Sequence, residues 1–233
     1  MSALKKLKEI QAERQTIMCL GLDLDTKRMP HDYTKNIKTM YDFAAAVIDA
    51  TSDLVCAYKP NLAFYESLGA EGLSLLRQIV TRIPKEIPVI LDAKRGDIGN
   101  TAAHYADALF DRLSADWVTL NPYMGYDSLR PFLERKDKGV FILALTSNPG
   151  SRDFQQLVVD GKPLYRIVAE KVLYWNKDDN CGLVFGATAP EQLKEMRQIC
   201  GDMPLLIPGV WEPREDLWKR QPVTEPTTSK KQR

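Results

Sequence analysis

Residues 88–101 read PVILDAKRGDIGNT, and this stretch decides the expected fold. The apolar run at 88–91 is typical of a short buried strand, and it ends in charge. Side chains alternate between the two faces of an extended chain, so we expect Asp92 and Lys94 on one face and Ala93 on the other. A helical pattern follows. The stretch therefore predicts a strand whose carboxyl end presents a carboxylate beside an ammonium.

A charge pair at the end of a buried strand has two interpretations. One is a structural ion pair, and the other is a functional site. Burying an isolated charge pair is costly and needs a compensating reason, so we favour the functional site. A second carboxylate, Asp97, lies in the loop that follows.

The same arrangement recurs along the chain. Six further apolar segments are predicted as strands, at 16–23, 54–59, 117–121, 139–146, 182–188 and 204–209. Helical periodicity lies between them, most clearly at 65–83 and 164–175. A strand-to-strand spacing of roughly 25–40 residues favours an α/β fold of the TIM (β/α)8-barrel type over an open sheet, because a barrel brings every strand end to one face. No Gly-x-Gly-x-x-Gly or Walker sequence supports the open-sheet dinucleotide alternative.

The longest polar loop covers residues 148–162, with Asp160-Gly161 as a hairpin-type turn. A long loop after a buried strand is a candidate lid over a binding site. An ordinary surface loop is the alternative, and the sequence leaves both open.

The strand and helix pattern stops after residue 210. Residues 211–233 contain no glycine and three prolines among charged and polar residues, a composition typical of a disordered tail. We therefore expect an incomplete barrel over residues 1–210, without the eighth β/α unit, and a polar, disordered tail over 211–233.

Composition excludes several classes of protein. The 233 residues carry a net charge of +1, so we expect no nucleic-acid or membrane partner. Four dispersed cysteines and two histidines argue against a zinc site and for reduced core thiols in a cytoplasmic protein. Residues 1–15 predict a short amphipathic helix and not a signal peptide, because they lack an apolar core segment.

Several strand ends together resemble one family. The segment 92–97, DAKRGD, matches the Asp-x-Lys-x-x-Asp signature of orotidine 5'-phosphate decarboxylase, in the bacterial long-form subgroup. Further matching segments are residues 21–23, 58–61, 119–123, 146–148 and 184–188, so the resemblance covers about residues 15–210. It implies a cytoplasmic, homodimeric carboxy-lyase of pyrimidine biosynthesis. Such an enzyme converts orotidine 5'-monophosphate (OMP) to uridine 5'-monophosphate (UMP) and CO2, without a cofactor or metal.

The resemblance also implies catalytic roles. Loss of CO2 from carbon 6 of the pyrimidine leaves a carbanion that the ring delocalises poorly. The carboxylate of Asp92 would lie near the leaving carboxylate, and the ammonium of Lys94 would stabilise the carbanion and then protonate it. Lys59 would extend the charge array, and Asp97 would act across a dimer interface.

Four more residues are candidates for substrate binding. The resemblance implies that Asp23, with Lys59, holds the ribose hydroxyls and that Thr101 reaches the same region from the partner subunit. It implies that Ser147 reads the pyrimidine, and Asn121 is a further candidate. The alternatives are a helix cap for Thr101, turn chemistry for Ser147 and packing for Asn121.

One part of the family pattern is missing. The family holds the substrate phosphate with loops after strands seven and eight, whereas residues 211–214 here read WEPR. We assign no phosphate ligand, and we expect the activity of this form to be impaired or lost. Two alternative functions remain: a metal-dependent phosphosugar decarboxylase or lyase of the same fold, and a non-catalytic subunit that dimerises through its strand-end face.

Overall fold

The computed structural model describes residues 1–188 and 190–209 of the chain. Seven parallel strands lie side by side in the order in which they occur in the sequence. They are β1 (Cys19–Gly21), β2 (Ala57–Lys59), β3 (Ile90–Arg95), β4 (Trp117–Leu120), β5 (Gly139–Leu145), β8 (Cys181–Phe185) and β9 (Leu205–Leu206). Two isolated parallel bridges, Tyr58 with Val89 and Asn61 with Asp92, connect the β1–β2 pair to the other five strands.

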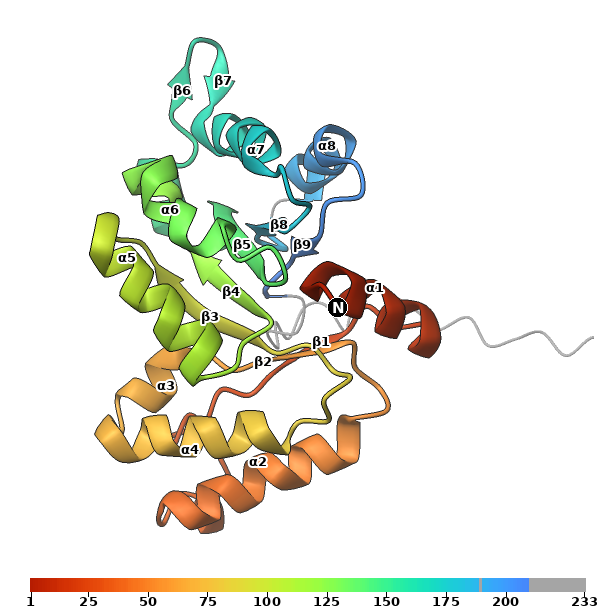
Figure 1. Cartoon of the computed structure of the whole chain (residues 1–233), viewed down its shortest axis with the longest axis vertical. Coiled ribbons are helices and arrows are strands. Elements are labelled where there is room, and N and C mark those ends of the chain that lie inside the picture. Colours follow the sequence, from red (N-terminus) through yellow and green to blue (C-terminus); the bar gives the residue numbers. More distant parts are fainter. Residues whose placement is uncertain (189, 210–233) are drawn as a thin grey trace, which may run out of the picture.

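Helices form a layer outside these strands (Figure 1). They are α1 (Ala3–Arg14), α2 (Ile37–Thr51), α3 (Leu62–Glu66), α4 (Gly69–Arg82), α5 (Gly99–Ala106), α6 (Tyr126–Leu133), α7 (Leu164–Trp175) and α8 (Pro190–Cys200). Four short helical segments are η1 (His31–Tyr33), η2 (Asp107–Arg112), η3 (Pro122–Met124) and η4 (Pro149–Asp153). Within the described ranges, no helix has both the length and the apolar character that a membrane span requires. The alternation of strands and helices is that of a TIM barrel, which confirms the predicted fold class.

The ends of the strand series are β1 and β9. In the described part of the chain, β1 pairs only with β2 and β9 only with β8. The expectations that concern the eighth β/α unit and the tail at 211–233 fall on residues outside those described.

Most predicted elements are confirmed, and the exceptions have local causes. The predicted helix at 164–175 coincides with α7. The single helix predicted over 65–83 is wrong, because α3 and α4 are separate helices that meet at Gly69, whose φ is +67°. The two helices also approach closely, since a Cβ on Gly72 would lie 1.9 Å from the Tyr65 carbonyl oxygen.

The loop after β5 contains the predicted hairpin. Strands β6 (Val158–Val159) and β7 (Lys162–Pro163) pair in antiparallel fashion around Asp160 and Gly161, both of which have positive φ. The hairpin extends away from the strands beside α7 (Figure 1). A lid role for this loop remains a prediction.

Helix α1 lies against the amino ends of the strands. Lys6 Nζ is 2.8 Å from Asp116 Oδ2, and the same oxygen accepts a 2.9 Å hydrogen bond from the backbone N–H of Val89. The indole Nε1 of Trp117 donates to the carbonyl of Ala3. These contacts fix α1 at the end of the molecule opposite the residues that the sequence places at the strands' carboxyl ends.

Candidate active site

Strand β3 bulges where its charged residues lie. Its register against β4 shifts between Leu91 and Arg95, so residues 92–94 all lie opposite Thr119. Lys94 has φ +46°, a left-handed conformation that is costly for a residue with a side chain. Simple extended alternation is therefore the wrong explanation for the position of Lys94, although the predicted contact with the neighbouring carboxylate is confirmed.

Two ammonium groups converge on the Asp92 carboxylate. Lys94 Nζ donates to both carboxylate oxygens, at 2.7 and 2.8 Å, and Lys59 Nζ lies 3.6 Å from Oδ2. Lys59 comes from the end of β2, so two strands supply the cations. The hydroxyl of Thr119 donates to Asp92 Oδ1 at 2.8 Å and accepts the backbone N–H of Lys94 at 2.9 Å. Thr119 thus satisfies the backbone donor that the bulge removes from the ladder.

Burial and the nearby charges shift the pKa values of two carboxyl groups, Asp92 and Asp23. Burial raises the pKa of Asp92, but Lys59, Lys94 and the Thr119 hydroxyl outweigh burial and bring the pKa below its usual value. Asp92 is therefore ionised at neutral pH. Partial burial raises the pKa of Asp23, against the opposing effects of Lys59 and a hydrogen bond from the Asn61 N–H.

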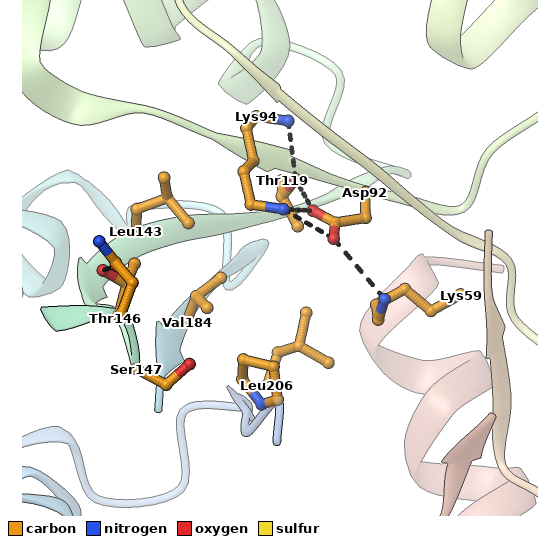
Figure 2. Close-up of a pocket in the computed structure, with 11 residues that line it drawn as sticks. Lys59, Asp92, Lys94, Thr119, Leu143, Thr146, Ser147, Val184 and Leu206 are labelled. Atoms are coloured by element: carbon orange, nitrogen blue, oxygen red, sulfur yellow. Dashed lines mark hydrogen bonds and ion pairs between the residues drawn. The ribbon is translucent and has the colours of Figure 1, made fainter. Parts of the chain in front are cut away.

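The array faces a cavity of about 340 Å³, within the range of small-molecule sites. Figure 2 shows the charged residues along one side, Thr146 and Ser147 on the opposite side, and Leu143, Val184 and Leu206 between them. The full lining is Lys59, Asp92, Lys94, Thr119, Leu143, Thr146, Ser147, Asn148, Val184, Leu206 and Pro208. Most of these residues come from the carboxyl halves of β2, β3, β4, β5, β8 and β9 or from the loops that follow them.

The cavity contains four of the predicted site residues, Lys59, Asp92, Lys94 and Ser147. Asp23 follows β1 and is near enough to Lys59 and Asp92 for the charges of these residues to affect its pKa. These placements agree with a single site at the strand ends, and the individual roles remain predictions.

The other three candidates lie outside the cavity lining of this chain. Asp97 Oδ1 accepts the N–H of the next residue, Ile98, at 2.8 Å. Thr101 is exposed on α5. Asn121 Oδ1 accepts the N–H of Tyr123 at 3.0 Å and caps η3, a local structural role that differs from the packing role considered as its alternative.

A close backbone approach shapes the wall that contains Ser147. A Cβ on Gly186 would lie 2.9 Å from the backbone nitrogen of Ser147 and 3.0 Å from its Cα. A side chain at position 186 would therefore clash with the backbone of the loop after β5, so this position requires glycine.

Sequence reasoning assigned no site role to three residues of this region, although two of them, Thr119 and Asn148, lie in segments that match the family. Thr119 lines the site and bonds Asp92; the available signal was one hydroxyl inside the apolar run WVTL at 117–120. Asn148 also lines the cavity, and Gln155 holds the Thr146 backbone from outside it. Gln155 is separated from the strand by a loop, and nothing in its local pattern marked it.

Among residues 1–188 and 190–209, no group of three or more His, Cys, Asp or Glu side chains is arranged to hold a metal ion. All four cysteines are free thiols. What the site offers chemically is an ionised carboxylate, two ammonium groups and a set of uncharged hydrogen-bonding groups.

Comparison with known sequences identifies the family. The chain matches the orotidine 5'-phosphate decarboxylase / HUMPS family over residues 16–222, which extends past residue 210, where we expected the resemblance to end. The orotidine 5'-phosphate decarboxylase of Herpetosiphon aurantiacus is 50% identical over 216 residues, covering 92% of this chain and 81% of that relative. That of Roseiflexus castenholzii is 53% identical over 205 residues, covering 87% and 75%.

Solved structures give the same result. The OMP decarboxylase of Leishmania donovani superposes with a TM-score of 0.83 at 43% identity, covering 90% of this chain and 80% of that one. A putative orotidine-monophosphate decarboxylase from Toxoplasma gondii has a TM-score of 0.83 at 37% identity, covering 88% and 78%. The chain therefore belongs to the orotidine 5'-phosphate decarboxylase / HUMPS family.

Proposed function

We propose that this chain is a carboxy-lyase that converts OMP to UMP and CO2. The observation that carries the proposal is the convergence of Lys59 and Lys94 on the ionised Asp92 at the wall of a cavity large enough for a nucleotide base. Family membership supplies the substrate class, and the array supplies the groups that the reaction needs.

Asp92 and Lys94 supply the carboxylate and the proton donor that the decarboxylation step uses. The bond between carbon 6 and the carboxylate breaks, its electron pair stays on carbon 6, and CO2 leaves. The negative charge on Asp92 repels the substrate carboxylate, and this repulsion falls as that group leaves as neutral CO2 and its negative charge moves to carbon 6. The Lys94 ammonium stabilises the carbanion and transfers a proton to it, which yields UMP and a neutral amine.

We assign the remaining contacts by position. Lys59 holds Asp92 and, with Asp23, contacts the ribose hydroxyls. Ser147 lies across the cavity from the charged residues (Figure 2), and we assign it to the pyrimidine. The phosphate ligands are left unassigned, because the residues after 209 lie outside the described structure.

The site also supports a homodimer in which Asp97 and Thr101 serve the partner subunit. Both residues follow β3, yet neither lines the cavity of its own chain. Large apolar side chains are exposed in the segments that follow β3 and β4, with Ile98 at 56% and Tyr123 at 83%. Co-expression of Lys94→Ala with Asp97→Ala variants tests the arrangement, because a mixed dimer contains one intact composite site. Recovered activity supports it, and no recovery in a verified mixed dimer contradicts it.

A cytoplasmic location is part of the proposal. Four free cysteines, three of them buried, fit a reducing compartment. Reaction of the purified chain with a thiol reagent after denaturation should give four modified cysteines without prior reduction.

The test of the function is CO2 release from OMP by the purified chain in the presence of EDTA. We expect release in EDTA, which a metal-dependent phosphosugar lyase would not show. No CO2 release from a chain that melts cooperatively would contradict the proposal.

A further inference from the structure

Gln155 lies behind the cavity wall and is fixed at both backbone groups. Its N–H donates to the carbonyl of Ser151 at 2.9 Å, and its carbonyl accepts the N–H of Tyr165, in the first turn of α7, at 2.8 Å. The side chain is half-buried and reaches Thr146, at the end of β5. It therefore connects a rigid helix start to the loop that lines the cavity.

The orientation of the Gln155 amide follows from the backbone. The N–H of Thr146 can only donate, so the atom 2.7 Å from it must be the amide oxygen Oε1. The amide nitrogen Nε2 then lies 2.9 Å from the Thr146 hydroxyl, and it can only donate. The hydroxyl of Thr146 is thereby an acceptor toward Gln155.

The direction of the Thr146 hydroxyl proton in turn fixes the orientation of the Asn148 side-chain amide. A hydroxyl has one proton, and with Gln155 Nε2 donating to Thr146 Oγ1 that proton is directed to Asn148 Oδ1, 2.6 Å away. The other candidate acceptor, Gln155 Oε1, is farther, at 3.2 Å, and already accepts a backbone N–H. The Oδ1 of Asn148 is therefore occupied, and its Nδ2 group keeps two donors.

Those donors belong to a residue that lines the cavity. Asn148 is part of the lining, and within residues 1–188 and 190–209 its Nδ2 donates to no protein atom. The absence of a side chain at Gly150 keeps this position open, since a Cβ there would lie 3.2 Å from Nδ2. Asn148, which contributes to the cavity lining, thus has amide donors that are free within the described residues and whose orientation is set through Thr146 by Gln155, which lies outside the cavity.

We propose that Gln155 is a positioning residue that, through the Thr146 hydroxyl, holds the Asn148 amide with its N–H groups toward the ligand. The wall then selects a pyrimidine that places a carbonyl oxygen there. A uracil-type ring has a carbonyl group at carbon 4 and cytosine has an amino donor there, while both rings have a carbonyl group at carbon 2. The selection therefore acts on the group at carbon 4. This inference rests on the proposed function, because it takes a pyrimidine nucleotide as the ligand.

The test compares UMP and CMP binding to Gln155→Glu by calorimetry. The new carboxylate accepts the Thr146 N–H but cannot donate to the hydroxyl, so Asn148 loses its fixed orientation. We expect the preference for UMP over CMP to fall about tenfold, the value of about one hydrogen bond. The measured quantity is the ratio of the UMP and CMP affinities, because the added negative charge should weaken the binding of both nucleotides equally. Gln78→Glu, at an exposed position on α4, is the control for charge and should leave the ratio unchanged.

A second variant keeps the inference testable if Gln155→Glu fails to fold. Asn148→Asp preserves the acceptor for Thr146 and replaces the donor toward the cavity with another acceptor. The ratio should then move toward CMP, whose amino group can donate. An unchanged ratio in both folded variants, with UMP still bound, overturns the inference alone. No UMP binding and no CO2 release by the unsubstituted chain would instead refute the proposed function, and this inference with it.

Discussion

The two ends of the same strands each contain a lysine–aspartate pair, and both pairs are largely buried. At the amino ends, Lys6 and Asp116 have side chains 15% and 20% exposed. At the carboxyl ends, Lys59 and Asp92 are 15% and 11% exposed. Burial of a charge pair therefore does not distinguish a structural contact from a functional one.

Three other features separate the two ends. Asp116 meets one ammonium and one backbone N–H, so its pairing is complete and ties α1 to the sheet. Asp92 meets two ammonium groups, one of them on a residue with left-handed backbone in a bulge. It also faces a cavity, which Asp116 does not line. A second ammonium group, a left-handed backbone conformation and an adjoining cavity therefore distinguish the carboxyl ends of the strands, where we place the function, from the amino ends.

The largest expected effect comes from neutralising the two carboxylates in turn. Asp92→Asn should lower kcat/KM for OMP by about 10³-fold or more, because it removes charge placed against the leaving carboxylate. Asp116→Asn, the matched change at the opposite end, should alter kcat/KM by less than about threefold. Steady-state kinetics on both variants measures this, and similar losses would remove the distinction between the ends.

Loss of the Lys6–Asp116 contact should lower the stability of the fold and leave the turnover of OMP nearly unchanged. Lys6→Met leaves Asp116 without its cation and should lower the free energy of unfolding by about 2 kcal/mol, since a partly buried carboxylate loses its partner. Turnover of OMP by the folded variant should stay near that of the unsubstituted chain. Urea denaturation and the same kinetic assay provide the two values. An unaltered denaturation midpoint would show that this pair contributes nothing to the fold.

Glycine substitution should have opposite effects on stability at Lys94 and Lys6, because the backbone conformations of the two residues differ. Lys94 has φ +46°, so Lys94→Gly should be more stable than Lys94→Ala by about 1 kcal/mol. Lys6 lies inside helix α1, so Lys6→Gly should be less stable than Lys6→Ala by about 1 kcal/mol. Denaturation of the four variants tests the claim, which fails if glycine destabilises at both positions.

A smaller effect concerns pH. The folded-state pKa of Asp92 lies below its ordinary value, so the ionised carboxylate stabilises the fold above the unfolded-state pKa. This contribution is lost as pH falls through the folded-state pKa. Melting temperatures of the unsubstituted chain and of Asp92→Asn should therefore differ most near neutrality and converge in acid. A constant difference between pH 3 and pH 7 would contradict the assigned ionisation.

The sequence predicts the elements whose signals are local. Helix α7 is found because its apolar spacing is regular, and the hairpin at Asp160-Gly161 because its turn residues accept positive φ. The contact between Asp92 and Lys94 is also predicted. Its cause, a bulge completed by the hydroxyl of Thr119, depends on a neighbouring strand and has no signal in β3 itself.

Tertiary contacts account for what the sequence did not predict. Gln155 reaches Thr146 only because the loop after β5 folds back on itself. The break between α3 and α4 depends on the conformation of Gly69 in a pattern that reads as one helix. The family resemblance brought Asp97 and Thr101 into the site, and within one chain they lie outside the cavity lining.

We propose that the convergence of Lys59 and Lys94 on Asp92 is the chemical centre, while the largely buried Lys6–Asp116 pair at the opposite end is structural. CO2 release from OMP by Lys94→Ala and by Lys6→Met, with both folds verified by cooperative melting, separates the two roles. We expect a loss of about 10³-fold or more for Lys94→Ala and little change for Lys6→Met. Undiminished CO2 release by folded Lys94→Ala would contradict it.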